Sequence, residues 1–293
     1  MNLSQEEIVN KPVPDSEWTK TIRPASGWFE FRLTELWAYR DLILLFVRRD
    51  FVAIYKQTIL GPLWYLIQPI LTTIVFTVIF GKVAKIPTDG LPPIMFYLSG
   101  VVVWRYFADC LQKTSNTFVG NANIFGKVYF PRLAVPVSIV ISNLISLGIQ
   151  LLLLAGFWLY FYRQGADFEV QAMVFLLPLL ILQMAALGLG CGIIVSSLTT
   201  KYRDLTQLVG FGVQLWMYAT PVVYPMSIIP AKYQWLMALN PMASVVELFR
   251  YACLGVGTIS YVQIAMSLVM TALLLLAGIL LFSRVEKSFM DTV

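Results

Sequence analysis

Long apolar runs without a charged residue dominate the pattern of hydrophobic and polar positions along the chain. They cover 57–81, 133–162, 170–200, 205–231 and 251–283. Each run exceeds the roughly 20 residues that cross a bilayer as a helix. A sixth segment, 91–112, is interrupted only by Arg105 and Asp109, whose i,i+4 spacing lets the two charges neutralise each other. The pattern predicts six membrane-spanning helices.

The same runs predict the fold class, an all-α integral membrane protein. Backbone groups in hydrocarbon have to be satisfied within the spanning structure, and membrane β-strands show short alternating segments instead. Composition agrees, because 58% of the residues are hydrophobic and 13% are charged. An average soluble domain is roughly 25% charged.

The N-terminal part predicts two further regions before the six-span domain, which covers 57–293. Residues 1–28 are polar and have no apolar core, so we expect a flexible cytosolic tail and no cleaved signal peptide. In 29–56 apolar residues recur at three-to-four spacing among charged ones. This spacing predicts an amphipathic helix in the cytosolic interface, and packing of that helix on other protein is the alternative.

The segment 224–257, between predicted spans five and six, is too long for a turn and too apolar for a free loop. It contains Pro225, Pro230 and Pro241, with the charged pair Glu247 and Arg250 near its end. We expect two short helices that re-enter the outer leaflet, where broken backbone is tolerated only against protein or a wet cavity. A hydrophobic cap without a transport role is the alternative.

The distribution of basic residues predicts that both termini lie in the cytosol. With the N-terminus inside, the inner flanks carry more than twice as many Lys and Arg residues as the outer loops, as the positive-inside rule requires. The net charge of +5 is therefore mostly a topology signal. Because the cations are spread among loops and form no single stripe, we expect no nucleic-acid partner.

The sequence contains no arrangement of residues typical of catalysis or metal binding. The chain has no histidine, and its three cysteines have no metal-ligand spacing. The stretch Gly120–Lys127 fails as a phosphate-binding loop, because five residues separate its glycines and Val128 stands where Ser or Thr is needed. We expect no metal site, no enzyme activity and no ATPase site. The scarcity of carboxylates within the spans also disfavours an ion-driven transporter.

Three local patterns carry a resemblance to a known family. The first runs from Val47 to Pro69 (VRRDFVAIYKQTILGPLWYLIQP), and the second is KVYFPR, 127–132, followed by Pro136. The third is PVVYP, 221–225, with Asn-Pro-Met at 240–242 and Arg250. Together with the six-span layout over about 30–290, the chain resembles ABC-2 type permeases, in particular the transmembrane subunit of an O-antigen or related lipid-linked polysaccharide exporter.

The resemblance implies a homodimeric permease in the bacterial inner membrane, with two ATP-binding cassette subunits that bind the ATP and magnesium. The chain itself would bind no cofactor. Its partners would be a second copy, the ATPase subunits, membrane lipids and an undecaprenyl-type lipid-linked polysaccharide. A permease of the same family for teichoic acid, capsule or a small molecule would share these motifs. A membrane-embedded transferase is disfavoured because acidic and metal-binding residues are lacking.

Candidate site residues follow from the chemistry of such a substrate. For the phosphate of the lipid headgroup we predict Arg48, Arg49, Lys56 and Arg105, since arginine forks match phosphate oxygens. Anchoring to anionic lipids, or pairing of Arg105 with Asp109, is the alternative. For apolar sugar faces we predict aromatic residues at span ends, which an interfacial belt would also explain. They are Trp64, Tyr65, Trp104, Tyr106, Trp216 and Tyr218.

Two further groups are predicted by position. Cytosolic loops transmit ATPase movement in such families, although ordinary positive-inside loops would look the same. The coupling candidates are Lys127, Tyr129, Phe130, Pro131, Arg132, Tyr202, Arg203 and Asp204. The outer gate candidates are Tyr224, Pro225, Asn240, Pro241, Glu247 and Arg250.

Overall fold

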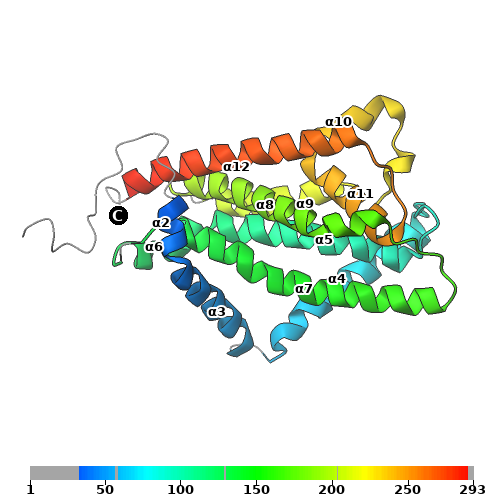
Figure 1. Cartoon of the computed structure of the whole chain (residues 1–293), viewed down its shortest axis with the longest axis horizontal. Helices are drawn as coiled ribbons and strands as arrows, with labels where there is room; N and C mark the ends of the chain where they lie inside the picture. The colour runs from blue at the N-terminus through cyan, green and yellow to red at the C-terminus, as the bar shows by residue number, and fades with distance from the viewer. Residues whose placement is uncertain (1–32, 57–58, 129, 203, 290–293) are drawn as a thin grey trace, which may run out of the picture. The chain divides into compact units, whose positions relative to one another are not determined.

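The computed structural model describes residues 33–56, 59–128, 130–202 and 204–289. Within these ranges every regular element is helical, as the apolar runs predict (Figure 1). The predicted tail, 1–28, lies outside the described residues.

The helices follow one another along the chain with short connections. They are α2 (Leu33–Ala38), α3 (Arg40–Lys56), α4 (Trp64–Phe76), α5 (Pro93–Ser115), α6 (Thr117–Phe125), α7 (Ala134–Arg163), α8 (Leu177–Thr199), α9 (Leu205–Tyr218), α10 (Gln234–Ala238), α11 (Pro241–Leu254) and α12 (Tyr261–Phe289). Shorter elements are the 3-10 helices η2 (Gly61–Leu63), η4 (Ala172–Leu176), η5 (Met226–Ile228) and η6 (Ala231–Tyr233), and the π-helix η3 (Thr77–Val83).

Five of the described helical segments are long and apolar enough to cross a bilayer. They are Gly61–Val83, Pro93–Ser115, Ala134–Arg163, Ala172–Thr199 and Tyr261–Glu286. These segments correspond to predicted spans one, two, three, four and six. The chain is therefore a multi-pass membrane protein.

Only part of the charge-free run 205–231, which predicts the fifth span, forms an α-helix. Its helix, α9, ends at Tyr218 after 14 residues, which at 1.5 Å per residue is about 21 Å, short of a hydrocarbon core of about 30 Å. Pro221 and Pro225 follow directly, and proline disfavours the helical conformation in the residue before it. The sixth crossing stays a prediction.

Two short helices, α10 and α11, occupy the segment between α9 and α12, where two were expected. Their re-entry into a membrane stays a prediction. The last span starts later than the charge-free run 251–283, because 251–254 still belong to α11. Gly255 then adopts the left-handed conformation (φ 74°) that commonly ends a helix, and α12 begins at Tyr261.

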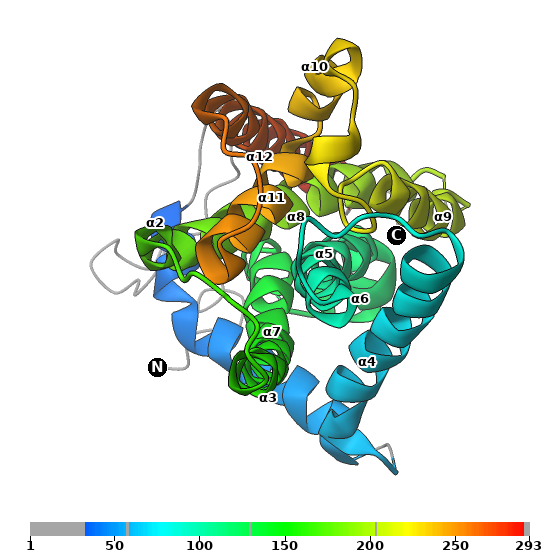
Figure 2. The same ribbon diagram turned by 90° about the vertical axis from the view of Figure 1, so that its right-hand side faces the viewer.

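Helix α5 is the centre of the fold and contacts α4, α7, α8, α9 and α11 (Figure 2). In its most apolar stretch 83% of residues are buried, against 17% in Gly61–Val83. Glycines let α8 approach α5 closely: a Cβ at Gly188 would lie 2.7 Å from the Cβ of Cys110, and one at Gly192 would lie 2.7 Å from that of Thr114. Such small-residue contacts replace the hydrophobic driving force that lipid does not supply.

A second, smaller core joins α3 to α6, α7, α8 and α12. On α3, Ile43 and Phe46 are buried in it, whereas Leu44 and Leu45 on α3 and Trp37 on α2 leave most of their surface exposed. The segment predicted to be amphipathic thus packs one edge on protein and leaves other apolar side chains open. Its contact with a membrane interface stays a prediction.

Candidate functional site

The three cations predicted near the cytosolic interface lie on α3 and differ in their surroundings. Arg49 is paired: its Nη2 lies 2.8 Å from Oδ1 of Asp50, and its guanidinium lies 4.8 Å from the ring centre of Phe46. Arg48 and Lys56 are exposed and form no ion pair with another described residue. The uncompensated positive charge on α3 therefore comes from Arg48 and Lys56.

The fourth predicted cation, Arg105, lies on the open side of the central helix. Between Met95 and Leu111 every residue of α5 is buried except Arg105 and Asp109, and Gln112 continues the same face as an exposed residue. The side chains of Arg105 and Asp109 are 31% and 21% exposed. We call Arg105, Asp109 and Gln112 the α5 stripe. All of its members are polar, although the helix lies in a span.

Arg105 uses little of its hydrogen-bonding capacity. Its Nη2 donates to Oε1 of Gln68 on α4, and its Nε lies 3.9 Å from Oδ2 of Asp109. A guanidinium has five N–H donors. Within the described residues Nε and Nη1 have no hydrogen-bond acceptor. The predicted pairing of Arg105 with Asp109 is present, but it is long and leaves donors free.

The six predicted aromatic residues fall into two sets. Trp104 and Tyr106 are buried, and Trp104 packs its ring edge-on against Phe107 at 5.3 Å and Trp216 at 6.1 Å. Trp216 is itself half-buried. The residues that reach the surface are Trp64 and Tyr218, each 42% exposed, and Tyr65, which is half-buried.

Two of the coupling candidates are internal supports. Phe130 is buried with its ring centre 5.7 Å from those of Phe46 and Phe125. Arg132 donates from Nη1 to the carbonyl oxygen of Glu286 at 2.8 Å, and its guanidinium lies 5.6 Å from the ring centre of Phe125. These contacts tie the loop after α6 to α3 and α12, so movement of this loop would reach both helices.

Other coupling candidates are accessible to a partner. Lys127 and Asp204 are exposed, and Tyr202 is 53% exposed with the ammonium of Lys201 5.4 Å from its ring centre. The remaining candidates are Pro131, which is half-buried, and Tyr129 and Arg203, which lie outside the described residues.

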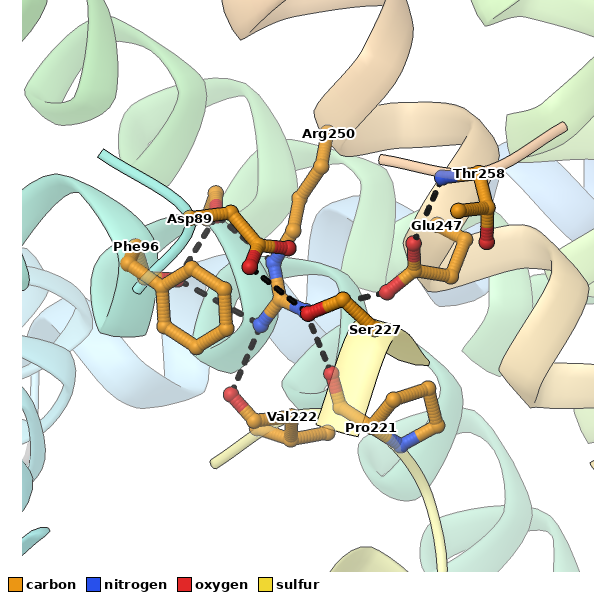
Figure 3. Close-up of polar contacts among 9 residues, drawn as sticks. Asp89, Phe96, Pro221, Val222, Ser227, Glu247, Arg250 and Thr258 are labelled. Carbon is orange, nitrogen blue, oxygen red and sulfur yellow. Dashed lines mark hydrogen bonds and ion pairs between the residues drawn. The ribbon is translucent and has the colours of Figure 1, made fainter. Parts of the chain in front are cut away.

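Of the outer gate candidates, Arg250 has the most contacts (Figure 3). Its Nη1 donates to the carbonyl oxygen of Pro221 at 2.5 Å, and its Nη2 donates to those of Val222 at 2.7 Å and Phe96 at 3.4 Å. Its Nε donates to Oγ of Ser99 at 3.4 Å, and the ring centre of Phe96 lies 3.8 Å from the guanidinium carbon. The residue is 1% exposed. Arg250 thus joins α5, the connector after α9 and α11.

Glu247 adds the negative charge of this cluster. Its Oε1 accepts from Nη1 of Arg250 at 3.5 Å, and its Oε2 accepts from the backbone N–H of Thr258 at 3.3 Å. Burial raises the pKa of the Glu247 carboxyl, and the Arg250 charge acts in the opposite direction. Nearby, Ser227 donates to Oδ1 of Asp89 at 2.7 Å (Figure 3). We call Arg250, Glu247, Phe96, Ser99, Pro221 and Val222 the Arg250 cluster.

Asn240 connects the end of α9 to the start of α11. Its Oδ1 accepts from the backbone N–H of Met242 and from Nε1 of Trp216, both at 3.1 Å. Its Nδ2 donates to Oγ1 of Thr220 at 2.9 Å. Asn240 is therefore the N-cap of α11. The other gate candidates are Tyr224, which is half-buried, and Pro225 and Pro241, which are buried.

Sequence reasoning missed two polar partners, Gln68 and Ser99. Gln68 is an amide within an otherwise apolar span, which is itself a signal of an interhelical contact. Ser99 has no such signal, because serine is common in helices of this kind. Among the described residues no three His, Cys, Asp or Glu side chains are close enough to hold a metal ion. The chemistry that the geometry offers is anion binding by arginine.

Comparison with known proteins identifies relatives along most of the chain. Residues 41–254 match the family model described as ABC-2 type transporter. The O-antigen export system permease protein RfbA of Klebsiella pneumoniae is 27% identical over 251 residues, which cover 86% of this chain and 94% of that protein. A protein of the same name from Myxococcus xanthus is 30% identical over 220 residues, covering 74% and 81%. The polysialic acid transport protein KpsM of Escherichia coli is 22% identical, covering 80% and 89%.

Proposed function

Because the chain belongs to the ABC-2 type transporter family, we propose that it is the membrane-spanning subunit of an ATP-driven exporter of a lipid-linked surface polysaccharide such as O-antigen. The observation that carries this proposal is the similarity to relatives named O-antigen export permeases, one of them matched over 94% of its length. The multi-pass fold and the arginine side chain within a span are consistent with it.

The energy for transport comes from separate ATP-binding subunits. Two of these would bind a homodimer of the chain on its cytosolic side, with both termini in the cytosol of a bacterium and the chain in its inner membrane. The exposure of Lys127, Tyr202 and Asp204 supports a role of these residues in contact with such a partner. Phe130 and Arg132 would pass the movement to α3 and α12, which they contact.

The lipid-linked substrate enters from the inner leaflet. Arg48 and Lys56 on α3, which pair with no acidic side chain among the described residues, offer positive charge to the phosphate headgroup. Trp64, Tyr65 and Tyr218 offer aromatic surface to the sugar chain. The polymer then passes along a path at the dimer interface. The α9 helix with the connector after it completes a sixth crossing, and α10 and α11 re-enter the outer leaflet and close the exit.

A second polymer class is favoured by one relative, the polysialic acid transport protein KpsM. The same architecture would then export capsule, and teichoic acid or a small molecule would use the same residues.

Deletion of the gene, followed by fractionation of lipid-linked glycan between cell interior and surface, tests the proposal. We expect glycan to accumulate inside and to disappear from the surface. Normal surface glycan of every class would contradict polysaccharide export and favour a small-molecule substrate.

A further inference from the structure

The α5 stripe is polar at a position where a membrane protein normally exposes apolar residues to lipid. Between Met95 and Gln112, the non-buried residues of α5 are Arg105, Asp109 and Gln112, which share one face, and Gln68 of α4 contacts Arg105. Charged side chains within a span face a water-filled space or other protein, because hydrocarbon does not solvate them. The stripe therefore lines a polar surface in the transporter.

Arg105 retains unused donors at this surface. Its guanidinium donates one hydrogen bond within the described residues, to Gln68, while Asp109 remains 3.9 Å away. In Arg250, by contrast, all three guanidinium nitrogens donate to oxygen atoms of the protein. The free donors of Arg105 match the oxygens of a phosphate, which arginine binds in a forked geometry.

The stripe is also close to the part of the chain where the substrate enters. Gln68, which contacts Arg105, lies in the second turn of α4, and η2, which directly precedes α4, contacts α3. On the proposed transport path, an anion that leaves the cations of α3 would meet the α5 stripe next. Asp109 would repel that anion and competes with it for Arg105.

We propose that Gln68, Arg105 and Asp109 form a binding site for a phosphate or diphosphate ester, in which Asp109 is a counter-ion that the arriving anion displaces from Arg105. Gln68 holds the guanidinium in place during the exchange. The role in transport rests on the proposed function, and the anion-binding site itself does not. In the empty transporter, Asp109 neutralises the charge of Arg105. When Asp109 pairs with Arg105 again, the anion is released from the site.

Binding measurements test this site in the full chain, purified in nanodiscs of phosphatidylcholine. The probes are geranylgeranyl diphosphate, inorganic pyrophosphate and geranylgeraniol. We expect Arg105→Gln to weaken binding of geranylgeranyl diphosphate by about tenfold or more, because charge-assisted hydrogen bonds are lost. Asp109→Asn should tighten it by about two- to fivefold, because the competing ion pair is removed. Geranylgeraniol, which lacks phosphate, should show none of these differences in affinity between the wild type and the variants.

Arg163→Gln is the matched control, because it removes an exposed arginine at the end of α7. It should leave binding unchanged. If the substitutions change the affinity for inorganic pyrophosphate in the same way, the site recognises the anion without its lipid. If only the lipid diphosphate shows it, the site needs a membrane-anchored ester.

Several results would overturn the inference. They are unchanged binding in Arg105→Gln, or weaker binding in Asp109→Asn with unchanged thermal unfolding. This failure differs from failure of the proposed function. Loss of surface glycan on gene deletion together with unchanged binding in the variants would contradict the anion site and support the exporter. Normal surface glycan together with the expected changes in binding would support the anion site and contradict the exporter.

Discussion

Arg105 and Arg250 are two arginines within the folded helical domain, and their surroundings differ in every respect that matters for function. Arg250 is 1% exposed and donates from all three guanidinium nitrogens. Arg105 is 31% exposed in its side chain and donates one described hydrogen bond. Arg250 is therefore a structural link between segments, whereas Arg105 keeps donors for the anion that we propose it binds.

The Arg250 cluster explains why α9 can end early without loss of order. Pro221 and Val222 follow the last turn of α9, and their carbonyl oxygens would be unpaired in a buried setting without Arg250. An unsatisfied buried polar group costs about 1–3 kcal/mol. The guanidinium therefore stabilises a broken backbone that the prolines impose.

The largest effect is expected from Arg250→Met compared with Arg105→Met. The first variant removes the hydrogen-bond donor of the Pro221 and Val222 carbonyls and the positive charge beside Glu247, so the free energy of unfolding should fall by about 3–5 kcal/mol. The second removes a partly exposed, long ion pair and should cost about 1 kcal/mol or less. Thermal unfolding and the yield of monodisperse protein in detergent measure both. Equal losses would break the distinction between the two arginines.

A smaller effect is expected at Gly100, which gives Arg250 its space. A Cβ at this position would lie 2.7 Å from Nη2 of Arg250 and 2.9 Å from the carbonyl oxygen of Val222. Gly100→Ala should therefore destabilise the protein by about 1–3 kcal/mol through overpacking. Gly148→Ala on α7 is the control, because a Cβ at that position would have no neighbouring atom within 4 Å. Unfolding temperatures that shift alike in both variants would argue against a tight cluster.

The smallest effect on stability is expected from Gln68→Leu at the α5 stripe. Gln68 is exposed, so the change in the free energy of unfolding should stay within about 0.5 kcal/mol. Binding of geranylgeranyl diphosphate should weaken all the same, because the guanidinium of Arg105 loses the group that orients it. Titration in nanodiscs and thermal unfolding of the same preparation separate the two effects. Stability lost without any change in binding would make Gln68 a packing residue.

Charge-free runs were sufficient to predict four of the five described spans, and the apolar segment interrupted by Arg105 and Asp109 predicted the other, because lipid imposes helices on any long apolar segment. The pairing of Arg105 with Asp109 was also predictable, since both residues lie on one helix at i,i+4 spacing. The amphipathic pattern before the first span indicated a helix there, and α3 supplies it.

The burial of Arg250 was not predictable from the sequence. Its acceptors come from Phe96, Pro221 and Val222, which are distant in the chain, and a carbonyl acceptor has no signature in a side-chain pattern. The contact between Gln68 and Arg105 likewise depends on how α4 packs on α5. The end of α9 could not be predicted from the charge-free run 205–231, because composition indicates hydropathy and does not indicate where the helix ends.

Substrate binding by Arg105 is tested most directly by surface glycan in a deletion strain that carries Arg105→Gln, with wild type and Arg163→Gln expressed at equal membrane levels. We expect the Arg105→Gln strain to accumulate lipid-linked glycan inside the cell, while the unfolding temperature of the variant stays close to that of the wild type. Surface glycan at the wild-type level in Arg105→Gln would contradict the claim that this arginine binds the exported substrate.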